Sequence, residues 1–373
     1  MENSFVHLHA HTEYSMLDGA AKIEPFLNRI LELEQPGAAI TDHGNLYGAL
    51  EFYNSAIEKK LKPIIGYEAY VISDSRFERP DRKNNKRYHL TLLAENTVGY
   101  WNLVEMASRA FTEGYYYKPR IDYELLKKYS EGIIALSGCL GGEIAQLLAP
   151  DGSVEEGNQG QTRSFDDALK KAEFYQSIFG ENNFFIELHK HGIKQQEDIL
   201  PDLLKISEKL SAPLVAANDS HYVHSDDASA HDALLCVQTN ATLDDENRFK
   251  FDGSGFYIKS SEEMRDLFPN EKFPNACNNT LKILDRVEYE FEKDTYYLPD
   301  FPIDDSNKNV DEYLKDKVYQ GAEGLYGELT SELEERINYE LEVIESMGFA
   351  SYFLIVGDLI NYAKSNGIRT GAG

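Results

Sequence analysis

Short apolar runs and helix-like stretches alternate along most of this chain, and the alternation limits the folds that it can adopt. Strands that alternate with helices favour a mostly parallel sheet wrapped by helices, either open or closed into a barrel. Hydrophobic residues recur at helical spacing in seven stretches, at residues 21–33, 46–60, 98–111, 142–148, 165–179, 195–210 and 226–238. The predicted strands lie in the runs VHLH, PGAAITDH, KPIIGYEAYV, HLTLLAEN, GIIALSG, NFFIELH and APLVAANDSH.

Residues that can bind metal ions lie at or just past the ends of these predicted strands. Barrels place their active sites at the carboxyl ends of their strands, so residues from all around the chain meet there. An open doubly wound sheet would gather ligands at one switch point, from fewer strands. We therefore predict an α/β fold of the barrel type. The residues at the strand ends are His9, His11, Asp42, His43, Glu68, Cys139, His189, Asp219 and His221.

Residues 5–19, FVHLHAHTEYSMLDG, place three histidines at alternate positions, and an aspartate follows seven residues after the last. A strand alternates its side chains between two faces, so His7, His9 and His11 can point the same way. Imidazole and carboxylate together suit zinc, manganese or iron better than calcium. Compared with the other strand ends, His9, His11 and Asp18 are the candidate ligands of this segment, and His7 is expected behind the site.

Three further motifs are TDHG at residues 41–44, GYEAY around Glu68, and NDSHY with Asp219 and His221 two residues apart. The candidate ligands exceed the four that are usual for one zinc, so we predict two or three ions with Glu68 or Asp18 as a bridge. Ions ~3.5–4 Å apart can activate a water on a phosphoester. Metal-assisted phosphoester hydrolysis, by a metal-bound water held by these ligands, is the leading prediction. The sequence has no GxxxxGK[ST] phosphate loop and no GxSxG elbow.

The residues alone leave several other side chains open. Cys139, in LSGCLGGE, is either a buried small hydrophobe or a ligand. His89 lies at the beginning of a predicted strand and not at its end, so from the residues alone it is equally a metal ligand or not one. Lys118 and Arg120, in YYYKPRID, are candidate phosphate contacts, although salt bridges are the commoner role of arginine. The other histidines are expected behind the ligands, as for His189 and His191, or on a helix surface, as for His224 and His231.

The charge of the chain argues against general affinity for nucleic acid. It has 37 basic and 64 acidic residues, a formal charge of −27, so a polyanionic substrate must be met locally. Residues 73–87 hold six basic residues against three acidic ones and are either a solvated loop or a contact for a phosphate backbone. Three distant cysteines, no signal peptide pattern and no apolar stretch near 18 residues predict a cytoplasmic protein that does not span a membrane.

The pattern changes after Asp285, where an acidic and aromatic loop leads to two helical stretches, an apolar segment and a glycine-rich end. One helical stripe holds Val310, Leu314 and Val318. The other holds Leu333, Ile337, Leu341, Ile344 and Met347. We therefore expect a metal-binding domain at residues 1–285 and a second region at residues 286–373.

Taken together, these motifs resemble the alpha subunits of bacterial DNA polymerase III. The resemblance rests on HAHTEYSMLDG, ITDHGNLYGALEFY, KPIIGYEAYV, YYYKPRID, LSGCLGGE, ANDSHYV and GFYIKSSEEM, in order along the chain. It implies a polymerase and histidinol phosphatase (PHP) domain, a distorted barrel of seven (β/α) units holding up to three metal ions. It also implies that residues 286–373 are a linker and the truncated beginning of the polymerase palm. The polymerase aspartates would then lie outside this chain, which we expect to be a fragment that does not polymerise DNA.

The resemblance implies a set of metal ligands and a choice of activities. Zinc is expected in two or three sites, with manganese or iron(II) as alternatives. The implied activity is a 3′–5′ proofreading exonuclease on DNA, with a silent, metal-stabilised module that docks a separate proofreading subunit, or a small-molecule phosphatase, as alternatives. The implied partners are DNA 3′ ends and, through the full-length protein, the sliding clamp, clamp loader and proofreading subunit. The implied ligands are His9, His11, Asp18, His43, Glu68, His89, Cys139, Asp219 and His221.

Overall fold

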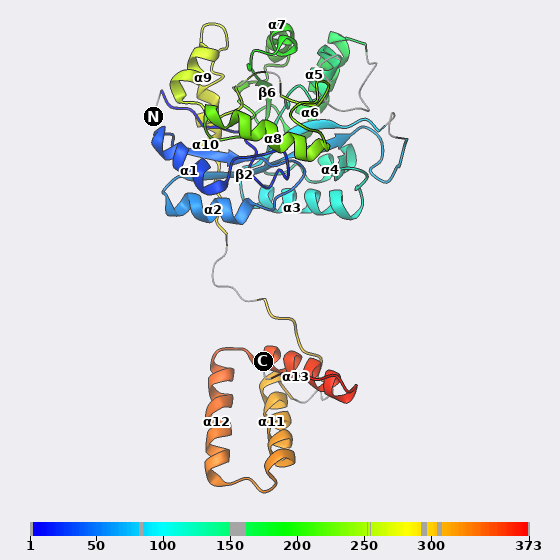
Figure 1. Ribbon diagram of the computed structural model, residues 1–373, viewed down its shortest axis with the longest axis vertical. Coiled ribbons are helices and arrows are strands. Elements are labelled where there is room, and N and C mark those ends of the chain that lie inside the picture. The colour runs from blue at the N-terminus through cyan, green and yellow to red at the C-terminus, as the bar shows by residue number, and fades with distance from the viewer. Residues whose placement is uncertain are drawn as a thin grey trace. The chain divides into compact units, whose positions relative to one another are not determined.

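The described part of the chain divides into two compact units (Figure 1). We call Met1–Glu290 the barrel unit and Phe291–Gly373 the helical unit. The boundary expected at residue 285 lies five residues before this division. The computed structural model describes residues 3–81, 85–149, 162–251, 253, 255–291, 297–303 and 308–371.

A seven-stranded mixed sheet forms the centre of the barrel unit. Its strands follow the order β1-β2-β3-β5-β6-β7, and β4 pairs with β2 outside this path. Among the described strands all pairings are parallel except those of β3, which runs antiparallel to both β2 and β5. The strands are β1 (Gly37–Ile40), β2 (Lys62–Ile72), β3 (Tyr88–Ala94), β4 (Arg120–Asp122), β5 (Ile133–Leu136), β6 (Phe184–Leu188) and β7 (Leu214–Ala216).

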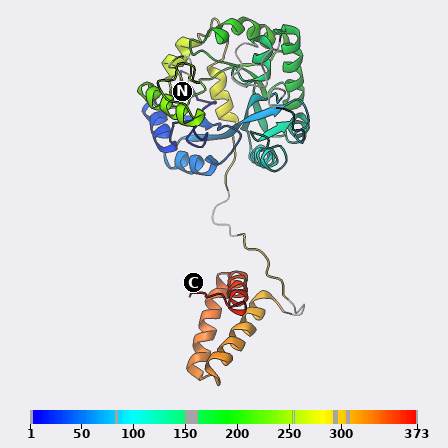
Figure 2. The same cartoon turned by 45° about the vertical axis from the view of Figure 1, so that its right-hand side comes forward.

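The N-terminal segment links the two ends of this strand path. Single parallel bridges join His7 to Ala38 of β1 and Ala10 to Ser220, four residues past β7. The amide of Ala39 donates to the carbonyl of His7 at 2.7 Å, and the amide of His11 donates to the carbonyl of Ser220 at 2.7 Å. The sheet is therefore curled (Figure 2), which confirms the expected α/β class and distorted barrel, followed by a helical segment.

Ten helices cover the sheet in the described part of the barrel unit, and side-chain caps begin several of them. Asn96, Asp122, Ser164 and Ser260 each accept a hydrogen bond from a backbone amide in the first turn of the following helix. The helices are α1 (Ile23–Glu32), α2 (Ala49–Glu58), α3 (Thr97–Thr112), α4 (Tyr123–Lys128), α5 (Glu143–Leu148), α6 (Phe165–Phe179), α7 (Lys194–Leu210), α8 (Ala228–Thr239), α9 (Ser261–Leu267) and α10 (Asn278–Arg286).

Strand alternation stacks the candidate site on an apolar layer inside the barrel. One buried cluster joins inward residues of the strands, among them Leu93 and Phe185, with Ile283 of α10. Two positions along β6 from Phe185, on the same face of that strand, lies Glu187. Two positions along β3 from Leu93, on the same face, lies Thr91. The polar site is thus built directly above a packed hydrocarbon floor.

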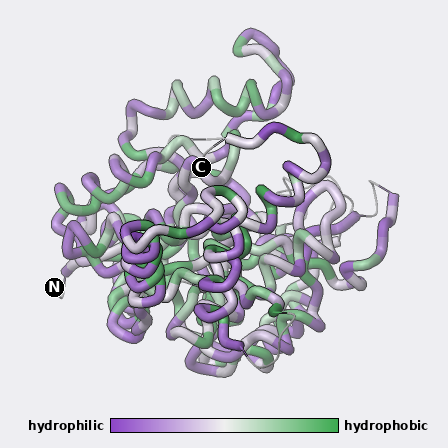
Figure 3. Tube along the Cα trace, turned by 90° about the horizontal axis from the view of Figure 1, so that it is seen from below, coloured by the Kyte–Doolittle hydropathy of each residue, from purple (hydrophilic) through white to green (hydrophobic). Residues whose placement is uncertain are grey.

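The helical unit contains α11 (Val310–Tyr326), α12 (Ser331–Ser346) and α13 (Ala350–Ser365). Its small core joins Leu314, Ala350 and Leu354, with Val318 and Leu341 packed against them. Met347, expected on the apolar stripe, is instead 62% exposed. Figure 3 shows hydrophobic and hydrophilic residues recurring in turn along the helices. Among the described residues no single helix is long and apolar enough to cross a membrane, and α12 and α13 meet that test only as a pair bent by 116°.

We predict that Leu93→Ala destabilises the barrel unit. Leu93 is fully buried in the interior cluster, so its truncation should leave a cavity and lower the free energy of unfolding by ~2–5 kcal/mol. Urea denaturation of the chain measures this change. The matched control is Leu50→Ala on α2, where the side chain is 58% exposed and the loss should stay below ~1 kcal/mol. Equal losses for the two variants would contradict the layered interior.

Candidate metal centre

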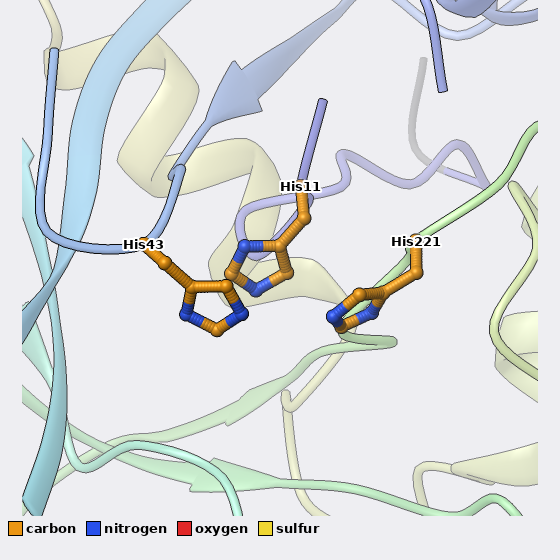
Figure 4. A group of neighbouring side chains, drawn as sticks. All are labelled: His11, His43 and His221. Carbon is orange, nitrogen blue, oxygen red and sulfur yellow. The ribbon is translucent and has the colours of Figure 1, made fainter. Parts of the chain in front are cut away.

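Side chains from six different segments meet above the apolar layer. The N-terminal segment contributes His9, His11 and Asp18, and all three lie within the first 18 residues. His43 follows β1, Glu68 lies within β2, and His89 begins β3, while Cys139 follows β5 and Asp219 and His221 follow β7. Figure 4 shows the imidazoles of His11, His43 and His221 directed toward one another. The structure thus brings together all nine side chains that the resemblance implies.

The carboxylate of Glu68 lies among four imidazole rings and is 1% exposed. Its Oε1 lies 3.3 Å from Nε2 of His9 and 3.1 Å from Nδ1 of His89. Its Oε2 lies 2.6 Å from Nδ1 of His43 and 3.7 Å from Nε2 of His11. Glu68 is in the interior of β2 and not at its end, because β2 extends beyond β1 to pair with β3. Because its two oxygens face different imidazoles, the carboxylate could bind two neighbouring cations.

Two further carboxylates face the same imidazoles from the other side. Oδ2 of Asp18 lies 2.7 Å from Nε2 of His43 and 3.6 Å from Nε2 of His221. Oδ1 of Asp219 lies 3.0 Å from Nε2 of His11. Asp219 has a φ of 44°, in the left-handed region that non-glycine residues rarely adopt. Strain of this kind is retained when its surroundings require a specific side-chain position.

The donor atoms gather into overlapping groups in which all atoms lie within 4.8 Å of one another. Three of these groups consist of implied ligands, and a fourth includes two residues outside that set. Groups that share members suit neighbouring ions with common ligands. The groups are His11, His43 and His221; His9, His11 and Asp219; His43, Glu68 and His89; and His9, Glu187 and His189.

Several buried nitrogen and oxygen atoms of the centre lie close to one another without a well-formed hydrogen bond within the described ranges. They include Nε2 of His9, Nε2 of His11, Oε2 of Glu68 and Oδ1 of Asp219. Unpaired polar atoms are costly in a protein interior, and these atoms point at one another and not at donors and acceptors of their own. Imidazole nitrogens and carboxylate oxygens are the ligands that zinc and similar ions prefer. The residues present therefore fit divalent cations.

A second set of hydrogen bonds fixes the ring orientation of His11. Ser15 donates its hydroxyl proton to Oδ1 of Asp42 at 2.6 Å, so Nδ1 of His11, 3.1 Å from the same hydroxyl oxygen, is the donor in that contact. This leaves the lone pair of Nε2 directed at the centre. Asp42 also accepts from the amide of Thr12 at 2.6 Å. Asp42 therefore supports the ligands, although the strand pattern had placed it among the candidates.

Glu187 is a part of the site that the sequence did not predict. Its side chain is fully buried, and it accepts from Nδ1 of His9 at 2.7 Å and from the amide of Gly138 at 2.9 Å. Burial alone would raise the pKa of Glu187, but the attraction of His9 and His189 outweighs it and lowers that pKa to about 2. The sequence signal that could have identified Glu187 is an acidic residue inside the apolar run NFFIELH, two positions before a histidine.

His89 and Cys139 meet at the rim of the centre. Because β3 is antiparallel to its neighbours, its first residues lie at the edge where the parallel strands end, which explains how a strand-opening histidine reaches the site. Sγ of Cys139 lies 3.6 Å from Nδ1 of His89 and 3.6 Å from Oε1 of Glu68. Burial and the charge of Glu68 raise the pKa of the Cys139 thiol to about 11, so a cation would be needed to favour its thiolate.

Three other histidines have hydrogen bonds behind or beside the site. Nε2 of His7 donates to the carbonyl of Lys259 at 2.9 Å, which agrees with a place behind the ligands. His191 bonds through Nε2 to the carbonyl of Asn218 at 2.8 Å. His231 was expected on a helix surface, but it is 2% exposed and bonds to the carbonyl of Asp18 at 2.8 Å, so this expectation was wrong.

The two basic residues proposed for phosphate differ sharply. Nζ of Lys118 lies 5.2 Å from the ring centre of Tyr70, and in the described ranges it has no carboxylate partner. Arg120 is 1% exposed, and its guanidinium donates to the side chain of Asn85 and to three backbone carbonyls. Its burial does not fit a phosphate contact, so only Lys118 remains a candidate. Residues 82–84 of the basic loop lie outside the described residues.

We predict that Glu187→Gln weakens metal binding without unfolding the chain. The amide retains the shape of the carboxylate but removes the charge that faces His9, and loss of such a supporting group typically costs ~10–100-fold in metal affinity. Competition with a chromophoric zinc chelator measures the affinity. Glu208→Gln, at an exposed position of α7, should bind as the native chain does. Unchanged affinity in Glu187→Gln would contradict the orienting role.

Comparisons with known proteins give a match in each of the two units. The family model "PHP domain" matches residues 7–191, and "Bacterial DNA polymerase III alpha NTPase domain" matches residues 312–373. DNA polymerase III subunit alpha of Borreliella burgdorferi is 43% identical over 99% of this chain, and that of Mycobacterium tuberculosis is 44% identical over 100%. The chain spans about a third of the length of these relatives, 31% and 32%.

One solved structure aligns only weakly with this chain. A solved two-domain protein from Bacteroides vulgatus, described as containing a PHP-like metal-dependent phosphoesterase, aligns with a TM-score of 0.36 and 10% identity. The alignment covers 79% of this chain and 72% of that one, and a likeness this low supports no functional argument. The two family matches and the full-length identities to curated relatives agree with the motifs and with the metal centre. The chain therefore belongs to the bacterial DNA polymerase III alpha-subunit family, of which it carries a PHP domain and a segment of the NTPase domain.

Proposed function

We propose that the centre is a metal-dependent phosphodiesterase that removes nucleotides from DNA 3′ ends, in the manner of a proofreading 3′–5′ exonuclease. The observation that carries the proposal is the position of Glu68, a buried carboxylate with four imidazoles within 3.7 Å of its oxygens. Two or three divalent ions, zinc first and manganese or iron(II) next, suit this donor set. Such ions, when bound, activate water and stabilise the charge that develops on a phosphoester.

The residues of the chain supply position and charge for this reaction. Glu68 joins the donor groups on its two sides, so neighbouring cations would be held at a short separation by one side chain. Asp18 and Asp219 add negative charge beside His43 and His11. Glu187 and Asp42 keep the rings of His9 and His11 in the orientation that leaves Nε2 free. Geometry set before substrate arrives reduces the reorganisation that the reaction needs.

A second function is a metal-stabilised structural module, and the closure of the barrel favours it. The segment with His9 and His11 is joined to β1 and to the region after β7 by single bridges, so the ordinary sheet pairing there is sparse. Ions held by His11, His43 and His221 would connect these same three segments. In this alternative the centre is catalytically silent and the domain supports the polymerase and docks a separate proofreading subunit.

The wider setting of the chain is part of the proposal. We assign residues 1–285 to the metal-binding barrel and residues 286–373 to a linker and the beginning of the palm. The longer protein would meet DNA 3′ ends, the sliding clamp, the clamp loader and a proofreading subunit in the cytoplasm. The full-length identity to curated alpha subunits supports this setting.

We predict that Glu68→Gln and Asp219→Asn each lower nucleotide release from a mismatched 3′ end by at least ~100-fold, because each removes a charge that faces the cations. Release of labelled nucleotide from DNA with Zn²⁺ or Mn²⁺ measures the rate. Asp198→Asn, an exposed carboxylate on α7, is the matched control and should act as the native chain does. Equal rates in all four proteins would reject the exonuclease, and faster cleavage of phosphomonoesters than of DNA would favour a small-molecule phosphatase.

We also predict that chelation lowers the Tm of the chain. An ion present at about 100 times its Kd adds ~2.7 kcal/mol to the free energy of unfolding, which corresponds to a Tm shift on the order of 5 °C per ion. Differential scanning fluorimetry with and without a strong chelator measures the shift. The shift is expected for either function, so the two are separated by nucleotide release. An unchanged Tm would argue against bound cations in both.

A further inference from the structure

Four aromatic side chains lie exposed beside the metal centre, and we call them the aromatic strip. They are Tyr47, Phe111, Tyr115 and Tyr117, with exposed fractions of 58%, 37%, 53% and 57%. The ring centres of Tyr47 and Phe111 are 5.9 Å apart, and those of Phe111 and Tyr115 are 6.1 Å apart. Large apolar groups that share a neighbourhood and remain in water mark a binding surface more often than isolated ones do.

One end of the strip is held next to a metal-centre histidine. Tyr47 follows His43 by four residues, and Asn45 fixes the turn between them. The side-chain amide of Asn45 donates to the carbonyl of His43 at 3.0 Å, and its oxygen accepts from the amide of Tyr47 at 3.0 Å. The position of the Tyr47 backbone is therefore tied to that of His43.

At the other end of the strip, Tyr117 is followed by a lysine that lies beside a neighbour of the same histidine. Tyr117 precedes Lys118, whose Nζ lies 5.2 Å from the ring centre of Tyr70, and the Tyr70 ring is stacked on His43 at 6.1 Å. Tyr117 has a φ of 62°, a conformation that costs free energy for a residue with a side chain. The turn keeps it there through a 3.1 Å hydrogen bond between the amide of Tyr116 and the carbonyl of Lys118.

We propose that the aromatic strip stacks the bases of single-stranded DNA and leads its 3′ end to the metal centre. The proposal rests on the phosphodiesterase function proposed above and names how its substrate is held. Stacking on aromatic rings accepts any base and does not need a basic surface, which suits a chain with a formal charge of −27. Lys118 lies between strip and centre, where it can contact one phosphate.

The charges around the strip point to bases and not to an extended phosphate track. Arg76 of the basic loop is paired with Glu113, Asp122 and Glu124, so it is not available for phosphate. With Lys118 as the only phosphate contact that the described residues offer to this proposal, the logarithm of the binding constant should fall with the logarithm of salt concentration with a slope of about −0.7. A track of several lysines and arginines would give a slope several times steeper.

The test measures binding of a labelled 12-nucleotide thymidine strand by fluorescence anisotropy, with phosphorothioate linkages at its 3′ end to prevent cleavage. Tyr47→Ala, Tyr115→Ala and Tyr117→Ala should each weaken binding by at least about fivefold. Tyr115→Phe should bind within about twofold of the native chain, because its ring still stacks. Trp101→Ala on α3 is the control, since Trp101 is 62% exposed but belongs to no contact of the strip. An abasic strand of equal length should bind the native chain at least about fivefold more weakly.

Equal affinity in the native chain and the three alanine variants would overturn the proposal, and so would an abasic strand that binds as well as the thymidine strand. Tighter binding of the matching RNA strand would also overturn it. The absence of any strand binding at concentrations up to about 100 µM would overturn it as well. If nucleotide release is absent while the strip variants still weaken binding, the phosphodiesterase fails and the strip stands. If nucleotides are released but the strip variants bind DNA as the native chain does, the phosphodiesterase stands and the role of the strip fails.

Discussion

The buried carboxylate of Glu68 among four imidazoles is the interaction on which the rest of the site depends. Taking a carboxylate out of water is expensive, and burial alone would raise its pKa. The nearby His89, His43 and His9 outweigh that effect and hold the pKa of Glu68 well below its usual range. Protons on the rings can provide such compensation, and divalent ions provide more charge to the same atoms. The centre is therefore electrostatically matched to cations.

The surrounding fold keeps these groups in place from below and from behind. Leu93 and Phe185 close the interior under the site, so the donor groups rest on close-packed hydrocarbon. Behind the rings, Glu187 accepts a hydrogen bond from Nδ1 of His9, and Asp42 holds the Ser15 hydroxyl that faces Nδ1 of His11, so Nε2 of both rings stays directed at the centre. Both layers restrict where the imidazoles can go, which is what a multinuclear site requires.

Much of this could be predicted from the sequence because the signals are local. Helical spacing predicted residues 165–179, which coincide with α6, and strand-end placement predicted His43 beside Asp219 in the centre. The features that the sequence did not predict depend on residues far away along the chain. The reversed direction of β3, which brings His89 to the site, is set by pairing with β2 and β5. The burial of Arg120 follows from carbonyls of a loop more than 35 residues earlier, and no local pattern reports it.

The joining of the first residues to the segment after β7 has a consequence for the order in which the protein is made. His11 bonds to Ser220, so the first ligands to leave the ribosome are completed by some of the last in the barrel unit. At about 5–20 residues per second, the 209 residues from Thr12 to Ser220 take roughly 10–40 seconds to synthesise. During that time His9 and His11 belong to an unclosed chain end. Completion of the centre is thereby a late event in the life of the nascent chain, and an ion that needs both segments could be bound only after residues 219–221 have emerged.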